Sequence, residues 1–273
     1  MALDLDRYFA RIGLDGPRTA NVDTLERLCF AHARTISFEN LDIHRGPNGI
    51  PISIALPNVF EKLVLQKRGG YCFEQNTLLL EVLRALGYHA RPLAARVLMG
   101  LTPTPRPRTH MLVLVESGGH AFLADVGFGG HNLLGPIVFE PDRERVAHGE
   151  TFRIREIPWD GKAHAPPPAF DLELKKGDGW VPLYRTSIEH QDAEDFVMSH
   201  WYTSTHPDSL FVHKKLISRA DAGMRQVLFD RELTIKRTGA ATETRVLESD
   251  EAYRAVLSDV FGLELPADPP LRW

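Results

Sequence analysis

Cys72 is the residue of this chain whose surroundings best suit nucleophilic chemistry. Two glycines and Tyr71 come directly before it, and residues 77–86 form a strong helix-forming stretch that Gly87 can end. Glycine lets the backbone bend sharply and lets other groups approach closely. The partial positive charge of a helix N-terminus favours thiolate over thiol, and thiolate is the nucleophilic form. The segment therefore predicts a reactive cysteine near the start of a helix.

A nucleophilic cysteine needs a base, and the base needs a group that orients it. His110 lies where a Pro-rich loop, residues 102–107, enters a predicted strand, and Asp125 ends the next predicted strand. The Ser-Gly-Gly segment at 117–119 predicts an antiparallel hairpin, in which cross-strand neighbours lie within contact reach. A carboxylate that accepts from one imidazole nitrogen leaves the other nitrogen facing the thiol. These residues predict a triad of Cys72, His110 and Asp125.

Each of these residues also has a purely structural interpretation. A buried cysteine is more often inert packing than a nucleophile, and Cys29, inside a predicted amphipathic helix, is given that interpretation. The chain has 12 histidines, and Asp125 also suits a turn before Gly127. Residue types and spacing by themselves leave the triad and these structural roles both open.

Composition narrows the classes of protein to which the chain can belong. It has 273 residues, 43% hydrophobic and 25% charged, which is ordinary globular composition. A formal charge of -4 argues against a general nucleic-acid binder. Two cysteines without a CxxC pattern predict neither a disulfide framework nor a thiolate metal site, and they fit the reducing cytoplasm. We expect neither a signal peptide nor a membrane-spanning segment.

The hydrophobic pattern changes along the chain. The first part reads as helical, with Asn21 and Pro57 near two helix starts. A run of hairpins in the middle predicts a barrel or a strongly curled sheet. In the last part, short strands precede a helix that Ser249 can cap and Gly262 can end. Strands are expected at residues 91–99, 111–115, 121–126, 152–157, 170–174, 180–184, 227–229 and 232–235.

Four stretches of the chain resemble the arylamine N-acetyltransferase family, in the family's order. They are residues 36–42 (ISFENLD), 68–76 (RGGYCFEQN), 108–111 (RTHM) with 125–129 (DVGFG), and 201–211 (WYTSTHPDSLF). Two positions depart from the family: members usually have Pro where this chain has Ser37, and Asn where it has His200. Neither departure touches the triad, and both lie where the acceptor pocket or the packing of the lid would be affected.

The resemblance implies an α+β multidomain fold with a triad like that of cysteine proteases. A helical bundle at 1–88 would carry Cys72, a central β-barrel at 89–200 would carry His110 and Asp125, and an α/β lid would span 201–273. It also implies ping-pong acetyl transfer from acetyl-CoA, a substrate and not a tightly bound cofactor, to arylamines, arylhydrazines or N-hydroxyarylamines. The expected partners are these small molecules, with neither nucleic acid nor membrane, and self-association stays open.

Residues in or beside the matched stretches are candidates for binding. The expected walls of the acceptor pocket are aromatic: Phe38, Tyr71, Phe128 and Phe211. The expected contacts with CoA are Thr109, Gly127, Gly129, Gly130, Thr205, His206 and Ser209, because glycine backbone and hydroxyl groups suit phosphates. The aromatic residues also suit a plain core, and the glycine run also suits a turn.

Two other functions use the same residues. A Cys-His-Asp hydrolase or transglutaminase-like enzyme has the same triad with different substrates. A non-catalytic CoA-binding or scaffold protein is the alternative from another class, and the complete set of Cys72, His110 and Asp125 argues against it.

Overall fold

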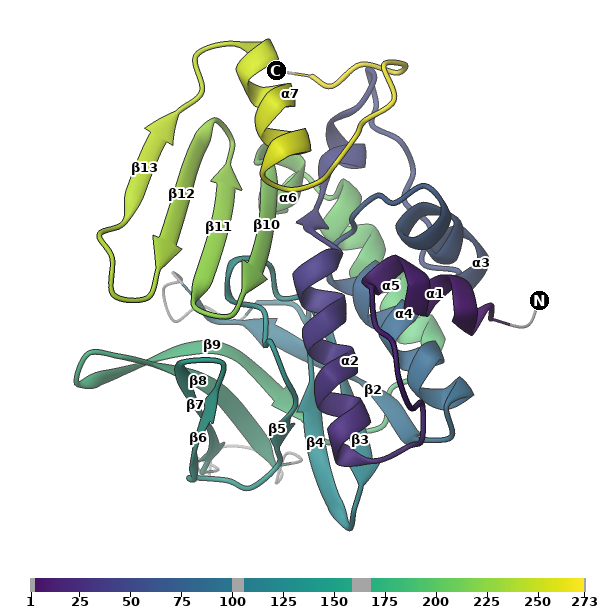
Figure 1. The fold of residues 1–273 in the computed structure, drawn as a ribbon, viewed down its shortest axis with the longest axis vertical. Helices are drawn as coiled ribbons and strands as arrows, with labels where there is room; N and C mark the ends of the chain where they lie inside the picture. The colour runs from purple at the N-terminus through teal and green to yellow at the C-terminus, as the bar shows by residue number, and fades with distance from the viewer. Residues whose placement is uncertain (1–2, 100–105, 159–167, 273) are drawn as a thin grey trace.

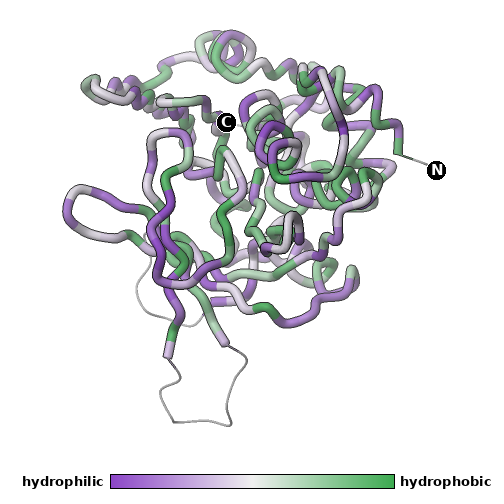
Figure 2. The backbone as a smooth tube through the Cα atoms, turned by 60° about the horizontal axis from the view of Figure 1, so that its bottom comes forward, coloured by the Kyte–Doolittle hydropathy of each residue, from purple (hydrophilic) through white to green (hydrophobic). Residues whose placement is uncertain are grey.

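The computed structural model describes residues 3–99, 106–158 and 168–272. Figure 1 shows a group of helices packed beside two sheets, with the eight-stranded sheet below the five-stranded one in that view. Hydrophobic stretches run through the packed centre, and more hydrophilic ones form the hairpins that project from it (Figure 2). No helix in the described part of the chain is both long and apolar enough to span a bilayer.

The first part of the chain is mainly helical, as its capping residues predict. Its elements are α1 (Leu5–Ile12), α2 (Val22–Thr35), the 3-10 helix η1 (Leu41–His44), α3 (Leu56–Phe60), the π-helix η2 (Glu61–Leu65) and α4 (Cys72–Ala85). The Asn21 side chain accepts from the backbone N–H of Thr24 at 2.8 Å and so caps α2. Most residues of α4 are buried, including the apolar residues Phe73, Leu79 and Leu83. Burial on nearly all sides makes α4 the central helix of this part.

The middle of the chain forms an eight-stranded antiparallel sheet. Its strands are β2 (His89–Val97), β3 (His110–Ser117), β4 (His120–Ala124), β5 (Ile137–Val138), β6 (Glu144–Ala147), β7 (Glu150–Ile157), β8 (Ala169–Lys176) and β9 (Gly179–Ser187). They follow the order β5-β4-β3-β2-β9-β8-β7-β6, and the end strands β5 and β6 contact each other. The expected α+β fold with a barrel is therefore confirmed, as a nearly closed barrel. Of the Pro-rich loop, residues 102–105 lie outside the described residues.

A second sheet joins the two ends of the chain. It runs β1 (Phe38–Glu39), β10 (Leu216–Asp221), β11 (Met224–Phe229), β12 (Glu232–Arg237) and β13 (Glu243–Val246), all antiparallel. The helices of this region are α5 (Ala193–Thr205), α6 (Leu210–His213) and α7 (Asp250–Asp259). Ser249 caps α7 by accepting from the N–H of Ala252 at 3.1 Å. Because Phe38 pairs with Ser218, the segment before Cys72 is part of the same sheet as the C-terminal strands.

Candidate active site

Cys72 is the first residue of α4, and close packing of the preceding loop fixes its position. A Cβ atom on Gly69 would lie 2.2 Å from the Ser37 carbonyl oxygen, and one on Gly70 would lie 2.8 Å from Oε2 of Glu74. Only glycine fits at such distances. The Cys72 side chain is almost fully buried, and its Sγ lies 3.7 Å from the carbonyl oxygen of Thr109. The loop therefore brings the thiol to the edge of the barrel at β3.

His110 and Asp125 meet across the hairpin of β3 and β4. Val113 pairs with Ala124, and continuing this register puts Asp125 opposite Leu112, so His110 is its diagonal neighbour on the same face. Nε2 of His110 lies 2.7 Å from Oδ2 of Asp125, and both side chains are buried. Because a carboxylate only accepts, Nε2 carries the proton. The other ring nitrogen, Nδ1, is then left to face the side chain of Cys72, which contributes to the raised pKa of the ring.

The charge of His110 is set by two opposing effects. Burial lowers the pKa of the imidazole, but the Asp125 carboxylate and the Cys72 side chain outweigh it and raise the pKa to about 10. The ring is therefore cationic at neutral pH, which favours thiolate beside it. Cys29 has the opposite setting: burial, with the Asp125 and Glu26 carboxylates, raises the pKa of its thiol to about 12. The Cys29 thiol is therefore protonated at neutral pH, which fits the structural role expected of it.

Asn76 is a part of the site that sequence reasoning missed. Its Nδ2 donates to Oδ1 of Asp125 at 3.0 Å and to the Met111 carbonyl at 2.7 Å, while its Oδ1 accepts from the N–H of Val126. Oδ1 of Asp125 also accepts from the N–H of Gly127 at 3.0 Å. Asn76 follows Cys72 by four residues, so the two share one face of α4. That spacing was the available signal, and the amide ties the nucleophile's helix to the carboxylate.

Two aromatic rings enclose His110 on the barrel side. The ring centroid of Phe128 lies 5.0 Å from that of His110, and the ring of Tyr184 on β9 also lies 5.0 Å from it. Burial, together with the nearby Asp125 carboxylate, raises the pKa of Tyr184 well above its usual value, so it stays neutral. Sequence reasoning selected Phe128 and missed Tyr184, whose strand is distant along the chain. The rings keep the imidazole in a largely apolar setting.

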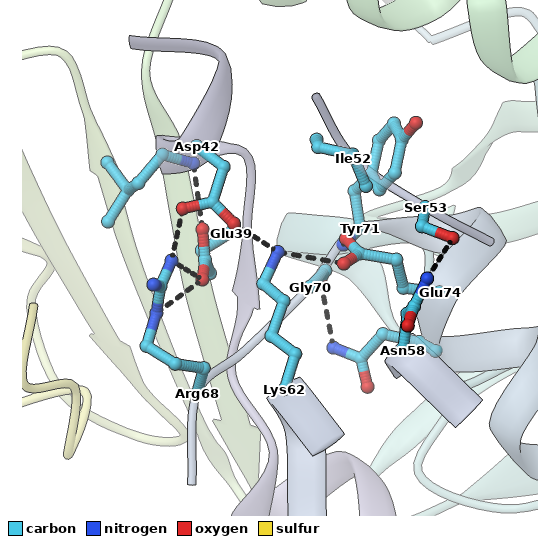
Figure 3. Close-up of polar contacts among 12 residues, drawn as sticks. Glu39, Asp42, Ile52, Ser53, Asn58, Lys62, Arg68, Gly70, Tyr71 and Glu74 are labelled. Atoms are coloured by element: carbon cyan, nitrogen blue, oxygen red, sulfur yellow. Dashed lines mark hydrogen bonds and ion pairs between the residues drawn. The ribbon is translucent and has the colours of Figure 1, made fainter. Parts of the chain in front are cut away.

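A buried ionic cluster lies behind the cysteine loop (Figure 3). Nζ of Lys62 lies 2.7 Å from Oε1 of Glu74 and 2.8 Å from Oδ2 of Asp42. Arg68 donates to Glu39 at 2.6 Å and to Asp42 at 3.0 Å. Removing one partner of such a cluster leaves a buried charge unpaired, which typically costs about 3–5 kcal/mol. The cluster therefore holds β1, η1 and the cysteine loop in fixed positions.

Glu74 links this cluster to the nucleophile. Its Oε2 accepts from the backbone N–H of Tyr71 at 3.0 Å, directly before Cys72. Burial raises the pKa of Glu74 to about 7; Lys62 opposes that rise, and Glu39 adds to it. The carboxyl group is fully enclosed, and it caps the first turn of α4 from the inside.

The four predicted aromatic residues fall into two groups. The rings of Phe38 and Phe211 lie 5.9 Å apart, and Tyr71 and Phe211 lie 6.3 Å apart, so these three form one cluster at the start of α4. Phe128 lies on the other side of the site, against His110 and Tyr184. Phe38 and Tyr71 are buried, whereas Phe128 and Phe211 are partly exposed. The latter two therefore have surface to offer a substrate.

A cavity of about 610 Å³ opens between the barrel and the second sheet. Its walls include Gly130 and apolar side chains such as Leu216 and Val227. Its basic lining residues are His131, His148, Lys176, Arg225, Lys236 and Arg237, and its acidic ones are Glu150, Asp221 and Glu232. Burial lowers the pKa of His131 to about 4, so that ring is neutral. The cavity thus combines an apolar wall with a rim of mixed charge, in which Arg225 pairs with Glu150 and Lys176 and Lys236 remain to attract an elongated anionic molecule.

Comparisons with known proteins agree with this geometry. The sequence model of a family described as N-acetyltransferase matches residues 21–269. An arylamine N-acetyltransferase of Escherichia coli K12 is 37% identical over 263 residues, which cover 95% of this chain and 88% of the relative. The chain belongs to the arylamine N-acetyltransferase family.

Two other members of the family are similar over nearly the same length. A Salmonella typhimurium protein named arylamine N-acetyltransferase / N-hydroxyarylamine O-acetyltransferase is 31% identical, covering 95% of this chain and 88% of its own. The structure of the Mycobacterium marinum arylamine N-acetyltransferase in complex with CoA matches with a TM-score of 0.85 at 34% identity, covering 95% of this chain and 92% of that one. The resemblance found in the four sequence stretches is confirmed.

Two residues expected to contact CoA lie in close backbone packing. A Cβ on Gly127 would lie 2.8 Å from Cα of Cys72, so this glycine lets the segment after β4 approach the nucleophile. Thr109 offers its carbonyl to the thiol. In η3 (Gly129–His131), a Cβ on Gly129 would contact Leu216 and Phe38, and Gly130 lines the cavity. The structure brings only Gly130 of the seven into the described lining of that cavity.

The other three expected contacts lie on the segment from α5 to α6. Thr205 donates to the Trp201 carbonyl at 2.6 Å, and Ser209 donates to the Thr203 carbonyl at 2.6 Å. The His206 ring stacks on Tyr202 at 4.5 Å. These side chains are thus engaged within their own segment, and their part in binding CoA stays a prediction.

The two departures from the family pattern each make a defined contact. Ser37 Oγ donates to the carbonyl of Phe261 at 2.8 Å, which joins the first strand to the end of α7. A proline has no hydroxyl and cannot make this bond. His200 bonds to Tyr71 and to Ile52, next to the nucleophile.

Proposed function

We propose that this chain catalyses acetyl-CoA-dependent N-acetylation of arylamines and arylhydrazines through acetyl-Cys72. The observation that carries the proposal is the arrangement of Cys72 at the start of α4 beside His110, whose Nε2 lies 2.7 Å from Oδ2 of Asp125. Family membership supports the same activity, and the Salmonella relative's name supports O-acetylation of N-hydroxyarylamines as a further reaction.

In the first half-reaction the Cys72 thiolate attacks the thioester carbon of acetyl-CoA. A C–S bond to the enzyme forms, and the bond to CoA sulfur breaks. The leaving CoA thiolate takes the proton that His110 carries on Nδ1, so CoA departs as a neutral thiol and the ring becomes neutral. The backbone N–H of Cys72 has no partner within the helix and can donate to the oxygen on which charge develops.

In the second half-reaction the amine nitrogen attacks the acetyl carbon held on Cys72. Neutral His110 accepts the proton that the nitrogen loses, and the cysteine leaves as thiolate beside the restored imidazolium. The acetylated amine departs, and the enzyme returns to its starting charge. Asp125 keeps the proton on Nε2 in both halves, so Nδ1 faces the reacting atoms throughout.

We propose that the cavity between barrel and second sheet receives CoA. Its cationic residues Lys176, Lys236 and Arg237 suit the phosphates, and Gly130 suits close approach of the chain that carries the thioester. Phe128 and Phe211 offer exposed ring surface for the flat acceptor, and Phe38 and Tyr71 pack behind Phe211.

The three-domain layout stays part of this proposal. It is supported by the separate cores of the barrel and of the second sheet. The core of the helices also takes in barrel residues such as Met111 and Val113, so it is continuous with one face of the barrel. Two elements cross the proposed limits: β1 lies in the first part but pairs with β10, and α5 spans residue 200.

The direct test is CoA release from acetyl-CoA, followed with and without a panel of aromatic amines and hydrazines. The proposal predicts a burst of CoA equal to the enzyme concentration without amine, and steady release with amine. Peptide or ester cleavage that needs no CoA would instead indicate a Cys-His-Asp hydrolase. Binding of CoA without release from acetyl-CoA would indicate a non-catalytic protein.

A further inference from the structure

His200 connects three segments that meet at the nucleophile. It lies on α5, half-buried, and its Nε2 is 2.9 Å from the carbonyl oxygen of Ile52, in the loop before α3. Its Nδ1 makes a short hydrogen bond with the hydroxyl of Tyr71. Ile52 and Tyr71 lie next to each other in Figure 3. One imidazole therefore ties α5, this loop and the residue before Cys72 together.

The partners determine where the proton of this ring lies. A carbonyl oxygen can only accept, so Nε2 of His200 must carry hydrogen. In a neutral ring Nδ1 is then bare, and it accepts from the Tyr71 hydroxyl. Neutral His200 thus satisfies a donor and an acceptor at the same time. In a protonated ring Nδ1 of His200 would also carry hydrogen. It would then donate to the Tyr71 hydroxyl oxygen, and it could no longer accept the hydrogen bond from that hydroxyl.

Tyr71 is well placed to transmit this constraint to the nucleophile. Its side chain is fully buried, and its backbone N–H is held by Glu74 directly before Cys72. Its ring packs edge-on against Phe73 at 5.5 Å and against His200 at 5.9 Å. The Tyr71 hydroxyl is buried between His200 and the Ser204 hydroxyl, and His200 also ties it to the Ile52 carbonyl, so the ring stays where His200 can reach it. A fixed Tyr71 side chain limits how far the first turn of α4 can shift.

We propose that His200 is a positioning residue, which in its neutral form holds Tyr71 and thereby keeps the Cys72 thiol aligned with His110. The proposal rests on the acetyl-transfer function proposed above and adds a residue to it. By the resemblance of the sequence motifs, His200 stands where members of the family usually have Asn. A carboxamide also carries one acceptor and one donor, but it does not titrate.

The groups that face His200 are consistent with a neutral ring. Tyr71, with Glu74 behind it, comes from α4, the Ile52 carbonyl comes from the loop, and the Ser204 hydroxyl lies near the Tyr71 phenol. Burial lowers the pKa of His200, and the Ile52 carbonyl only partly opposes this. The ring is therefore neutral at pH 7 and gains its proton as the pH falls below about 6.5, the usual pKa of histidine.

The test compares wild type with His200→Asn, His200→Leu and Tyr71→Phe, and uses His190→Asn as a control. His190 is an exposed histidine just before α5 whose ring lies 3.0 Å from Asp192. The rate measured is single-turnover acetylation of Cys72 at saturating acetyl-CoA. His200→Leu should slow this step about tenfold, less than the roughly hundredfold that a 1 Å misplacement can cost. His200→Asn should restore it, and His190→Asn should leave it unchanged.

The pH dependence separates positioning from general stability. The ratio of the His200→Asn rate to the wild-type rate should rise about threefold or more between pH 7 and pH 5, where histidine titrates. Groups common to both proteins cancel in this ratio. A flat ratio, or a His200→Leu protein as fast as wild type, would overturn the proposal. So would a His200→Asn protein as slow as His200→Leu.

A second measurement needs no substrate. The shifts in melting temperature of His200→Leu and Tyr71→Phe should not add in the double variant, because both remove the same hydrogen bond. Additive shifts would show that the two side chains act independently and would overturn the proposal. Absence of acetylation in the wild type, with non-additive shifts, would refute the acetyl-transfer function while leaving the tie between His200 and Tyr71 intact.

Discussion

Replacing Asp125 with Asn should nearly abolish acetyl transfer, although the change in volume is small. Oδ1 of Asp125 accepts two hydrogen bonds, from Nδ2 of Asn76 and the N–H of Gly127, both at 3.0 Å. An amide NH2 group in that place would oppose two donors. The carboxamide oxygen must therefore take the Oδ1 position, which turns the NH2 group toward Nε2 of His110.

That orientation forces the wrong tautomer on the base. The NH2 group donates to Nε2 of His110, so the ring proton moves to Nδ1, where the neutral imidazole can no longer accept from the thiol or the amine. The loss of the carboxylate also removes a main cause of the raised pKa of His110. In a serine-protease triad the same substitution lowers turnover about ten-thousand-fold, or roughly 5 kcal/mol in activation free energy. We expect a loss of this order in single-turnover acetylation of Cys72.

The control is Asp171→Asn, which changes another buried aspartate. Asp171 lies on β8 and pairs with Arg185, so its substitution should lower the melting temperature without altering the rate of acetylation. Circular dichroism and melting temperature show whether each variant is folded. A well-folded Asp125→Asn protein with a rate near that of wild type would refute the assignment of Asp125 as the group that orients His110.

Three further results follow from the same geometry. Because the pKa of His110 is raised from 6.5 to about 10, its charge is fully present below pH 6.5 and is lost as the pH rises through about 10. Alkylation of Cys72 by iodoacetamide should therefore stay fast at pH 6. A pH profile like that of a free thiol, with a pKa of about 8.5, would contradict the ion pair. Phe128→Ala should change the relative kcat/KM of different arylamines by about 1–3 kcal/mol, while the burst of CoA released from acetyl-CoA changes less. Equal losses for every amine and for the burst would show that Phe128 supports the fold instead. Asn76→Ala removes a hydrogen bond to the Asp125 carboxylate, worth about 1.5–3 kcal/mol, so acetylation of Cys72 should slow by roughly tenfold or more. An unchanged rate would show that the backbone N–H of Gly127 suffices to hold Asp125.

Local signals in the sequence were sufficient to predict the main helices and the approach of His110 to Asp125. Asn21 and Ser249 cap their helices as predicted, because a cap depends only on residues within one turn. The hairpin of β3 and β4 brings His110 and Asp125 together for a similar reason: its turn sets the register of neighbouring strands.

Contacts between distant segments left no comparable signal. The two-residue strand β1 (Phe38–Glu39) is too short for an alternating pattern, so its pairing with β10 was not predicted. Asn76 reads as an ordinary polar residue of a helix until β3 packs against that helix. The glycine run suits close approach of a phosphate or a turn, and neither reading points to the packing of Gly127 against the backbone of Cys72. Which residue a glycine lets come close is decided by tertiary packing and not by the run itself.

The most direct test of the account is the mass of the protein after incubation with acetyl-CoA in the absence of amine. The account predicts one acetyl group per chain, on the peptide that contains Cys72, and its loss with release of acetylated amine when an arylamine is added. Cys72→Ala should carry no acetyl group, and Cys29→Ala should be acetylated like wild type, since the Cys29 thiol is buried and protonated. An acetyl group on Cys29, or on neither cysteine, would contradict the account.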